Sequence, residues 1–134
     1  MITQLEERFC ALGTVLGLTK FRTRRERLST ELYLYERHAL EMEIDWRENE
    51  LFFYAVRLRG GKLPGTNTVY RYSDGQPCRT FLEDIYHAKR PAVKDRRERY
   101  SEAHLMESFA FYERQIVSDP EVLRQHFLAM DESV

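Results

Sequence analysis

Three carboxylates alternate with apolar residues near the middle of the sequence. Glu41, Glu43 and Asp45 are separated by Leu40, Met42, Ile44 and Trp46. Carboxylates in such a row suit binding of a hard cation, general acid–base catalysis or docking of a basic partner. A structural interpretation is also open, because a half-buried strand needs a polar residue at every second position.

The spacing argues against a metal site built from this row alone. Residues on one face of a strand are about 6.6–7 Å apart, whereas hard cations bind carboxylate oxygens at about 2.0–2.6 Å. Two neighbours could share an ion, but three in line cannot complete its coordination. A nuclease-like carboxylate followed by Glu-x-Lys also lacks its lysine, because Asp45 stands two positions after Glu43. We therefore predict no catalytic residues, no metal and no cofactor.

Acidic residues are concentrated around the row. Residues 31–50 hold seven acids, Glu31, Glu36, Glu41, Glu43, Asp45, Glu48 and Glu50, against Arg37 and Arg47. Some of them can pair across a sheet with the arginines at 22, 24, 25 and 27. The rest suit a docking face for a basic partner, and tyrosines are enriched in such interfaces. The predicted partner-binding residues are Glu41, Glu43, Asp45, Glu48, Glu50, Tyr33 and Tyr35.

Other residue types that perform chemistry are scattered. No metal-ligand spacing joins the four histidines, which are His38, His87, His104 and His126. A metal-independent ribonuclease could still combine His87 with Lys89, Arg90 and a tyrosine around a phosphate. The sequence contains no nucleophile elbow, phosphate-binding glycine loop or dinucleotide fingerprint.

Two basic runs favour an alternative function in nucleic-acid binding. They comprise Lys20, Arg22, Arg24, Arg25 and Arg27, and Lys89, Arg90, Lys94, Arg96, Arg97 and Arg99. The second run leads into Tyr100, so phosphate-binding and aromatic side chains are adjacent. The net charge of −1, from 21 basic and 22 acidic residues, provides no overall field for nucleic acid or an anionic membrane.

Length and composition predict one globular domain over residues 1–134. Apolar residues make up 43% of the chain and aromatic residues 13%, which is typical of a packed protein. Cys10 and Cys78 lack the spacing of a metal or redox motif and are expected to be reduced thiols. The first residues do not form the apolar core of a signal peptide, and no stretch is apolar enough to span a membrane. We therefore expect a cytoplasmic protein.

Helical spacing of apolar residues marks both ends of the sequence. Thr3 and Glu6 form a capping-box pattern ahead of a stripe that begins at Leu5 and ends near Gly17. Three C-terminal helices are predicted, one from Pro77 to before Pro91, one around residues 105–116 and one opening at Pro120.

An apolar period of two marks the middle of the sequence. It predicts strands over residues 31–36, 38–46 and 51–59, with a hairpin loop at 47–50, and a shorter strand over 68–72. Residues 19–30 are either a solvated connection or an edge strand. The order favours an α+β fold with an N-terminal helix and a central antiparallel sheet of about three to five strands from consecutive hairpins. Two to three C-terminal helices should pack on one face.

These patterns together favour a non-enzymatic protein-binding domain. The best match is a bacterial immunity or antitoxin type of inhibitor that neutralises a basic toxin, such as a nuclease, through the acidic sheet face. A secretion-type chaperone is a neighbouring interpretation. The alternative is a nucleic-acid-binding domain or small metal-independent ribonuclease that uses the arginine and lysine clusters.

Overall fold

The protein is described by a computed structural model that covers residues 2–26, 28–65, 70–91 and 101–132. Its elements in chain order are α1 (Ile2–Leu16), β1 (Lys20–Arg25), β2 (Ser29–Tyr35), β3 (Ala39–Asp45), β4 (Glu50–Val56), β5 (Arg79–Phe81), α2 (Leu82–Tyr86), α4 (Glu102–Ser118) and α5 (Pro120–Glu132). An N-terminal helix, a block of strands and C-terminal helices confirm the predicted α+β class.

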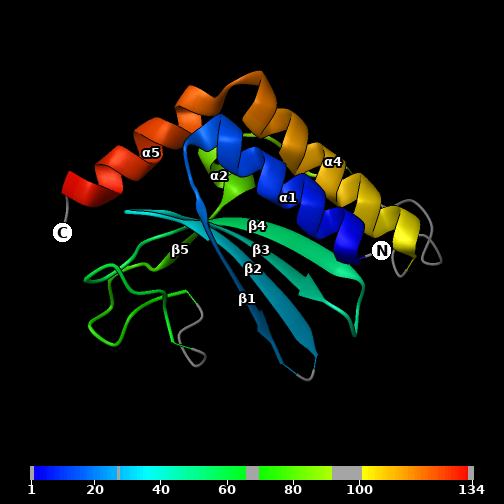
Figure 1. The fold of residues 1–134 in the computed structure, drawn as a ribbon, viewed down its shortest axis with the longest axis horizontal. Helices are drawn as coiled ribbons and strands as arrows, with labels where there is room; N and C mark the ends of the chain where they lie inside the picture. Colours follow the sequence, from blue (N-terminus) through cyan, green and yellow to red (C-terminus); the bar gives the residue numbers. More distant parts are fainter. Residues whose placement is uncertain (1, 27, 66–69, 92–100, 133–134) are drawn as a thin grey trace.

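The five strands form one antiparallel sheet in the order β1-β2-β3-β4-β5, so each strand pairs with its neighbour in sequence. Helices α1, α4 and α5 lie on one face of this sheet, and α2 packs beside β4 (Figure 1). We call the other side the helix-free face. By strand alternation this face carries Lys20, Arg22 and Arg24 of β1, Glu31, Tyr33 and Tyr35 of β2, Ala39, Glu41, Glu43 and Asp45 of β3, Phe52, Tyr54 and Val56 of β4, and Arg79 and Phe81 of β5. The connection between β4 and β5 covers part of this face.

The predicted register of β3 is confirmed. Leu40, Met42 and Ile44 are fully buried between the sheet and the helices. Trp46 is partly buried against the same core, and its indole N–H donates to Thr30 Oγ1 at 2.8 Å. The apolar residues of the alternating pattern therefore determine the face of the sheet on which the helices pack.

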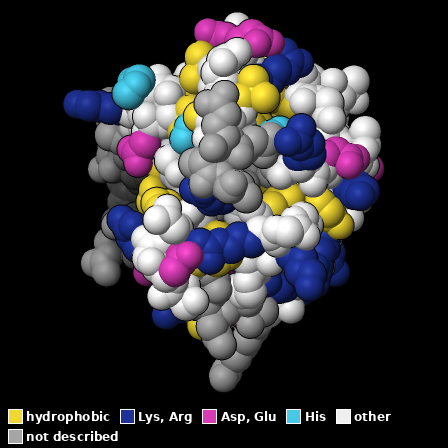
Figure 2. Space-filling model, turned by 90° about the vertical axis from the view of Figure 1, so that its left-hand side faces the viewer, with side chains coloured by type: hydrophobic (Ala, Val, Ile, Leu, Met, Phe, Trp, Pro, Cys, Tyr) yellow, Lys and Arg dark blue, Asp and Glu magenta, His cyan; other side chains and the backbone are white. Residues whose placement is uncertain are grey.

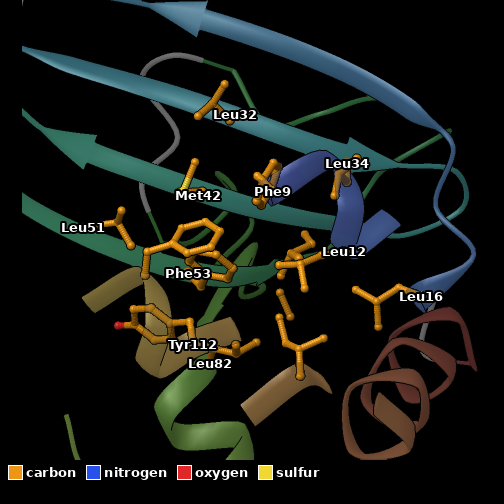
Figure 3. Packing of buried hydrophobic residues seen from close by; sticks show 14 of the residues in the cluster. Phe9, Leu12, Leu16, Leu32, Leu34, Met42, Leu51, Phe53, Leu82 and Tyr112 are labelled. Carbon is orange, nitrogen blue, oxygen red and sulfur yellow. The ribbon is translucent and has the colours of Figure 1, made fainter. Parts of the chain in front are cut away.

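Phe53 occupies the centre of the core beneath the helical layer (Figure 3). Its ring meets Phe9 and Phe109 edge-on, with ring centroids 5.6 and 5.5 Å apart, and stacks on Tyr112 at 4.8 Å. These contacts join β4 to α1 and α4. Aromatic pairs with this geometry stabilise a core beyond the area that they bury.

The end of α1 depends on a glycine. A Cβ atom at Gly13 would lie 2.5 Å from the carbonyl oxygen of Leu18, because the chain folds back over the last turn of the helix. The Leu18 N–H donates to the Gly13 carbonyl oxygen at 2.9 Å. This close approach directs the chain from α1 into β1.

The region after β4 differs from the prediction. Of the strand expected at residues 68–72, the first two residues lie outside the described part, and Tyr70 to Tyr72 form no strand. Arg71 and Pro77 instead make an isolated bridge in which the chain turns back on itself. The helix expected from Pro77 begins at Leu82, because residues 79–81 pair with β4 as strand β5. Of the two interpretations of residues 19–30, the edge strand is confirmed for residues 20–25, which form β1, whereas Ser29 and Thr30 begin β2 and residue 27 lies outside the described part.

No helix within the described residues has the length and apolar character needed to cross a membrane.

Candidate functional site

The seven predicted binding residues lie in two places. Tyr33, Tyr35, Glu41, Glu43 and Asp45 belong to the helix-free face, because they alternate with the core residues of β2 and β3. Glu48 lies in the turn between β3 and β4, and Glu50 is the first residue of β4, where it pairs with Asp45. Burial and pairing differ strongly among them, so each has to be considered by its own contacts.

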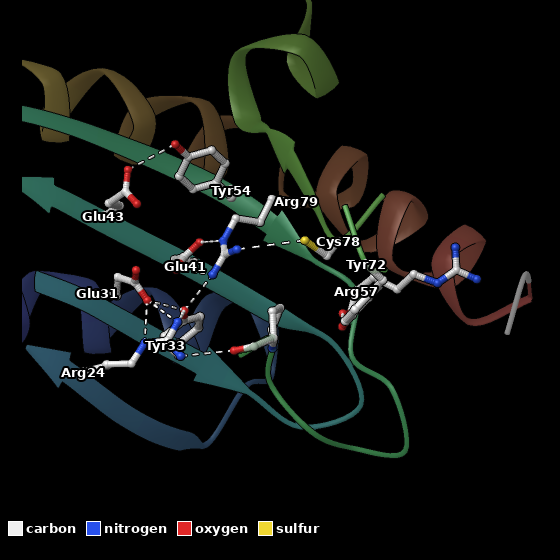
Figure 4. Close-up of polar contacts among 11 residues, drawn as sticks. Arg24, Glu31, Tyr33, Glu41, Glu43, Tyr54, Arg57, Tyr72, Cys78 and Arg79 are labelled. Atoms are coloured by element: carbon white, nitrogen blue, oxygen red, sulfur yellow. Dashed lines mark hydrogen bonds and ion pairs between the residues drawn. The ribbon is translucent and has the colours of Figure 1, made fainter. Parts of the chain in front are cut away.

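Glu41 is buried in an ion pair. Its side chain is 0% exposed, and its two carboxylate oxygens accept hydrogen bonds of 2.5 and 3.3 Å from Nε and Nη2 of Arg79. Arg79 Nη2 also donates to the Tyr33 hydroxyl oxygen at 3.0 Å (Figure 4). Burial raises the pKa of Glu41, and the hydrogen bonds and positive charge of Arg79 oppose this shift. Glu41, which was predicted to bind a partner, does not face water, because a cation from β5 covers it.

Tyr33 belongs to the same buried network. It is 1% exposed, and its hydroxyl donates to Glu31 Oε2 and accepts from Arg24 Nη2, each at 2.7 Å. Arg24 Nε also donates to Glu31 Oε2 at 2.8 Å, across β1 and β2. The predicted neutralisation of acids by the first basic run is therefore confirmed for this pair. Tyr35 is half-buried against the smaller apolar cluster on this face.

Glu43 has a different environment. Its side chain is half-buried, and Oε1 accepts a hydrogen bond of 3.3 Å from the Tyr54 hydroxyl (Figure 4). Burial raises the pKa of Glu43 to about 7, and the charges of Glu41 and Glu31 add to the shift. Glu43 forms no ion pair with a cation in the described residues. It is therefore a carboxylate whose ionisation the fold opposes.

The β3–β4 hairpin carries the other predicted acids. Asp45 is half-buried, and its Oδ1 accepts the backbone N–H of Arg47 at 3.0 Å. Glu48 is exposed. Glu50 is engaged within the protein, since Arg90 Nη2 and His104 Nε2 each lie 3.3 Å from its Oε2. Neither Asp45 nor Glu48 forms an ion pair with a cation in the part of the chain that is described.

A cluster of aromatic rings lies beside Glu43. Phe52 is directly opposite Glu43 in the pairing of β3 with β4, and its ring centroid is 5.9 Å from that of Phe81. Tyr54 and Tyr70 continue the cluster, with centroids 4.9 and 5.7 Å from Phe81. Phe52 and Phe81 are half-buried, and Tyr70 is 49% exposed. Partly exposed aromatic rings are enriched in protein-binding surfaces.

The residues considered for a ribonuclease are not gathered at one site. The Arg90 guanidinium donates to the Leu51 carbonyl oxygen at 3.1 Å and lies 4.5 Å from the ring centroid of Phe52. His87 instead lines a pocket of about 440 Å³ together with Thr80, Asp84, Ile85, Val122, Gln125 and His126. Neither Lys89 nor Arg90 lines this pocket. Arg90 therefore contacts residues at the start of β4, and it does not line the pocket that contains His87.

His126 contributes to the pocket with a buried ring atom. Its Nε2 has no hydrogen-bond partner within the described residues, and burial lowers the pKa of the imidazole. A smaller cavity of about 210 Å³ adjoins, since Thr80 and His126 line both. In the described ranges, no three or more His, Cys, Asp or Glu side chains are placed so that they could hold a metal ion.

Sequence reasoning missed Arg79, which neutralises Glu41, and the aromatic pair Phe52 and Phe81. The alternation of Arg79 and Phe81 about Thr80 was the available signal, but three residues are too few to establish a period. No protein-family model, curated protein or solved structure matches the chain significantly.

Proposed function

We propose that the chain is a non-enzymatic protein-binding domain of the immunity or antitoxin kind, which neutralises a basic toxin such as a nuclease. The observation that carries the proposal is a set of carboxylates with no described cation in ion-pair contact, at one end of the helix-free face. Glu43, Asp45 and Glu48 form this set, and the half-buried rings of Phe52 and Phe81 accompany Glu43. We call these five residues the acidic docking surface.

The raised pKa of Glu43 supports this proposal, because it shows that the fold disfavours the ionised carboxylate. Its pKa of about 7 means that a large fraction of the molecules carry a proton on this carboxylate near neutral pH. A lysine or arginine of a partner would favour the ionised form and would remove the unfavourable interactions with Glu41 and Glu31. A residue that lowers stability without serving the fold is expected where selection maintains binding.

The acidic docking surface is smaller than the set of residues predicted from sequence. Glu41 and Tyr33 are buried in the network with Arg79, and Glu50 is engaged by Arg90 and His104. These three side chains are engaged within the protein and are therefore not part of the surface that contacts the partner. Phe52 and Phe81 replace the tyrosines as apolar anchors, since partly exposed aromatic rings commonly supply much of the binding energy in interfaces.

A charge-reversal experiment tests the proposal. The variant Glu43→Lys/Glu48→Lys alters the acidic docking surface, and Glu7→Lys/Glu107→Lys makes the same change in charge at exposed positions on α1 and α4. Each protein is immobilised, exposed to a lysate of its source cells and analysed by quantitative mass spectrometry. We expect a basic protein to be retained in about equimolar amount by the wild type and the control variant, and to be lost from the docking variant.

Kinetics with the captured partner provide a second measurement. Stopped-flow association of the wild type should slow as the salt concentration rises, and association of the docking variant should depend less on salt. Equal retention of the same proteins by all three chains would contradict the proposal. Retention of RNA instead of a protein would favour the alternative of a nucleic-acid-binding domain.

A further inference from the structure

The connection between β4 and β5 is much longer than a hairpin needs. Residues 57–78 join two strands that pair directly, whereas hairpin loops commonly have about two to five residues. Long irregular connections in compact domains usually serve binding or catalysis. This one contains four cations, one acid and two tyrosines, which are Arg57, Arg59, Lys62, Arg71, Asp74, Tyr70 and Tyr72. We call residues 57–65 and 70–78, the described part of it, the basic connection.

Backbone hydrogen bonds hold the basic connection in a defined shape. The Arg57 N–H donates to the Cys78 carbonyl oxygen at 2.9 Å, and the Cys78 N–H donates to that of Tyr70 at 2.8 Å. Arg59 and Lys62 exchange a further pair of backbone hydrogen bonds, 3.0 and 3.2 Å long. The side chains of the basic connection therefore project from a frame that is anchored at both strands.

The single acid of the basic connection is engaged by Arg59. Asp74 Oδ2 lies 2.6 Å from Arg59 Nη2, and the same guanidinium lies 4.0 Å from the ring centroid of Tyr72. Lys62 and Arg71 are exposed and form no ion pair with an acid in the described residues. Figure 2 faces this end of the molecule, and Lys and Arg side chains are prominent across its lower half. A local positive surface therefore exists in a protein whose net charge is −1.

Tyr70, which directly precedes Arg71 in the chain, supplies an aromatic platform on the basic connection. Its side chain is 49% exposed, although its ring packs 5.7 Å from Phe81 and 6.3 Å from Tyr54, centroid to centroid. Neighbouring rings thus fix the orientation of Tyr70 while solvent reaches part of it. Unpaired bases stack on exposed aromatic rings in grooves that carry positive charge, and Tyr70 is such a ring on a segment with four cations.

We propose that the basic connection binds single-stranded nucleic acid, with a base stacked on Tyr70 and phosphates bound by Arg59, Lys62 and Arg71. Phosphate contacts give affinity that is independent of sequence, and stacking accepts any base. Single strands are favoured over duplexes because stacking requires a base that is not paired. This site lies outside the two basic runs seen in the sequence. It adjoins the acidic docking surface, because Tyr70 packs against Phe81.

Fluorescence anisotropy with labelled twelve-nucleotide oligouridine and oligothymidine tests the proposal. At low salt we expect saturable binding with a dissociation constant in the micromolar range. With about three phosphate contacts, the logarithm of the binding constant should fall with the logarithm of salt concentration with a slope of about −2. Lys62→Glu/Arg71→Glu should weaken binding at least tenfold. The control Arg47→Glu/Arg114→Glu reverses two exposed cations elsewhere and should change binding less than twofold.

The variant Tyr70→Ala separates stacking from simple attraction of anions. It should weaken oligonucleotide binding at least fivefold and leave binding of heparin unchanged. Thermal melts followed by circular dichroism verify that each variant is folded. Absence of saturable binding, tighter binding of a duplex of the same length, or equal binding by Tyr70→Ala and wild type would each overturn the proposal. Binding to anionic phospholipid vesicles without binding to either oligonucleotide would overturn it as well.

Discussion

Replacing Glu43 by glutamine should stabilise the protein at alkaline pH and have little effect under acidic conditions. The pKa of Glu43 is raised to about 7 by burial and by the charges of Glu41 and Glu31, from a value of 4.5 for an unperturbed glutamate. Glutamine resembles the protonated acid in shape and retains an oxygen that can accept the hydrogen bond from Tyr54. The substitution therefore removes the charge while preserving the local contacts.

The direction in which stability changes with pH follows from proton binding. The folded state holds the Glu43 proton more tightly than the unfolded state, so the stabilisation from the protonated form is complete below about pH 4.5 and is lost as pH rises through about 7. The shift corresponds to an upper bound of about 3 kcal/mol. Because the carboxylate is half-buried and solvent screens part of its interactions, we expect a difference of about 1–2 kcal/mol at pH 8.

Urea denaturation of wild type and Glu43→Gln between pH 5 and 8.5 measures this difference. The free energy of unfolding of the variant should exceed that of the wild type by an amount that grows with pH. Glu48→Gln, at an exposed position of the adjoining hairpin, serves as control and should change stability by less than about 0.5 kcal/mol throughout. A constant difference, or a variant that becomes less stable than wild type at high pH, would refute the assignment of Glu43 as an uncompensated carboxylate.

Two further substitutions test the buried parts of the sheet, both by urea denaturation at pH 7. Arg79→Met should destabilise the protein by about 3–5 kcal/mol because it leaves Glu41 buried without its cation, and Arg79→Met/Glu41→Leu should recover much of that loss; equal stability of the single variant and wild type would contradict the ion pair. Ile44→Ala should cost about 2–5 kcal/mol because the side chain is fully buried, and a cost below about 1 kcal/mol would mean that the register of β3 is wrong.

Periodicity in the sequence was sufficient to predict those helices and strands that bury one continuous row of apolar side chains. The helical stripe from Leu5 to Leu16 gave α1, and the alternation from Leu40 to Ile44 gave the core face of β3. Both elements are long enough for a period to be visible, and their burial follows directly from it. For β5, three residues could not reveal a period, so its position could not be predicted.

The site was harder to predict than the fold. Alternation in a strand specifies which face of the sheet a residue lies on, but not which residues from other elements cover that face. Glu41, Glu43 and Asp45 share the helix-free face as expected, yet only the contacts of each residue distinguish a buried ion pair from an available charge. Arg79 stands 38 positions after Glu41, and its segment resembled the start of a helix that opens at Pro77. Pairing over this distance depends on the fold, and local sequence carries no signal for it.

The short length of β5 accounts for the different states of Glu41 and Glu43. Strand β5 ends at Phe81, which is paired with Tyr54, and Tyr54 is paired with Glu41 on the next strand. Arg79 is paired with Val56, which is paired with Ala39, and its side chain extends from this position to the carboxylate of Glu41, two residues further along β3. Glu43 lies one pleat further along, opposite Phe52, where β5 has no residue to pair with β4. The fold thus neutralises Glu41 and leaves Glu43 without an ion pair to any cation among the described residues.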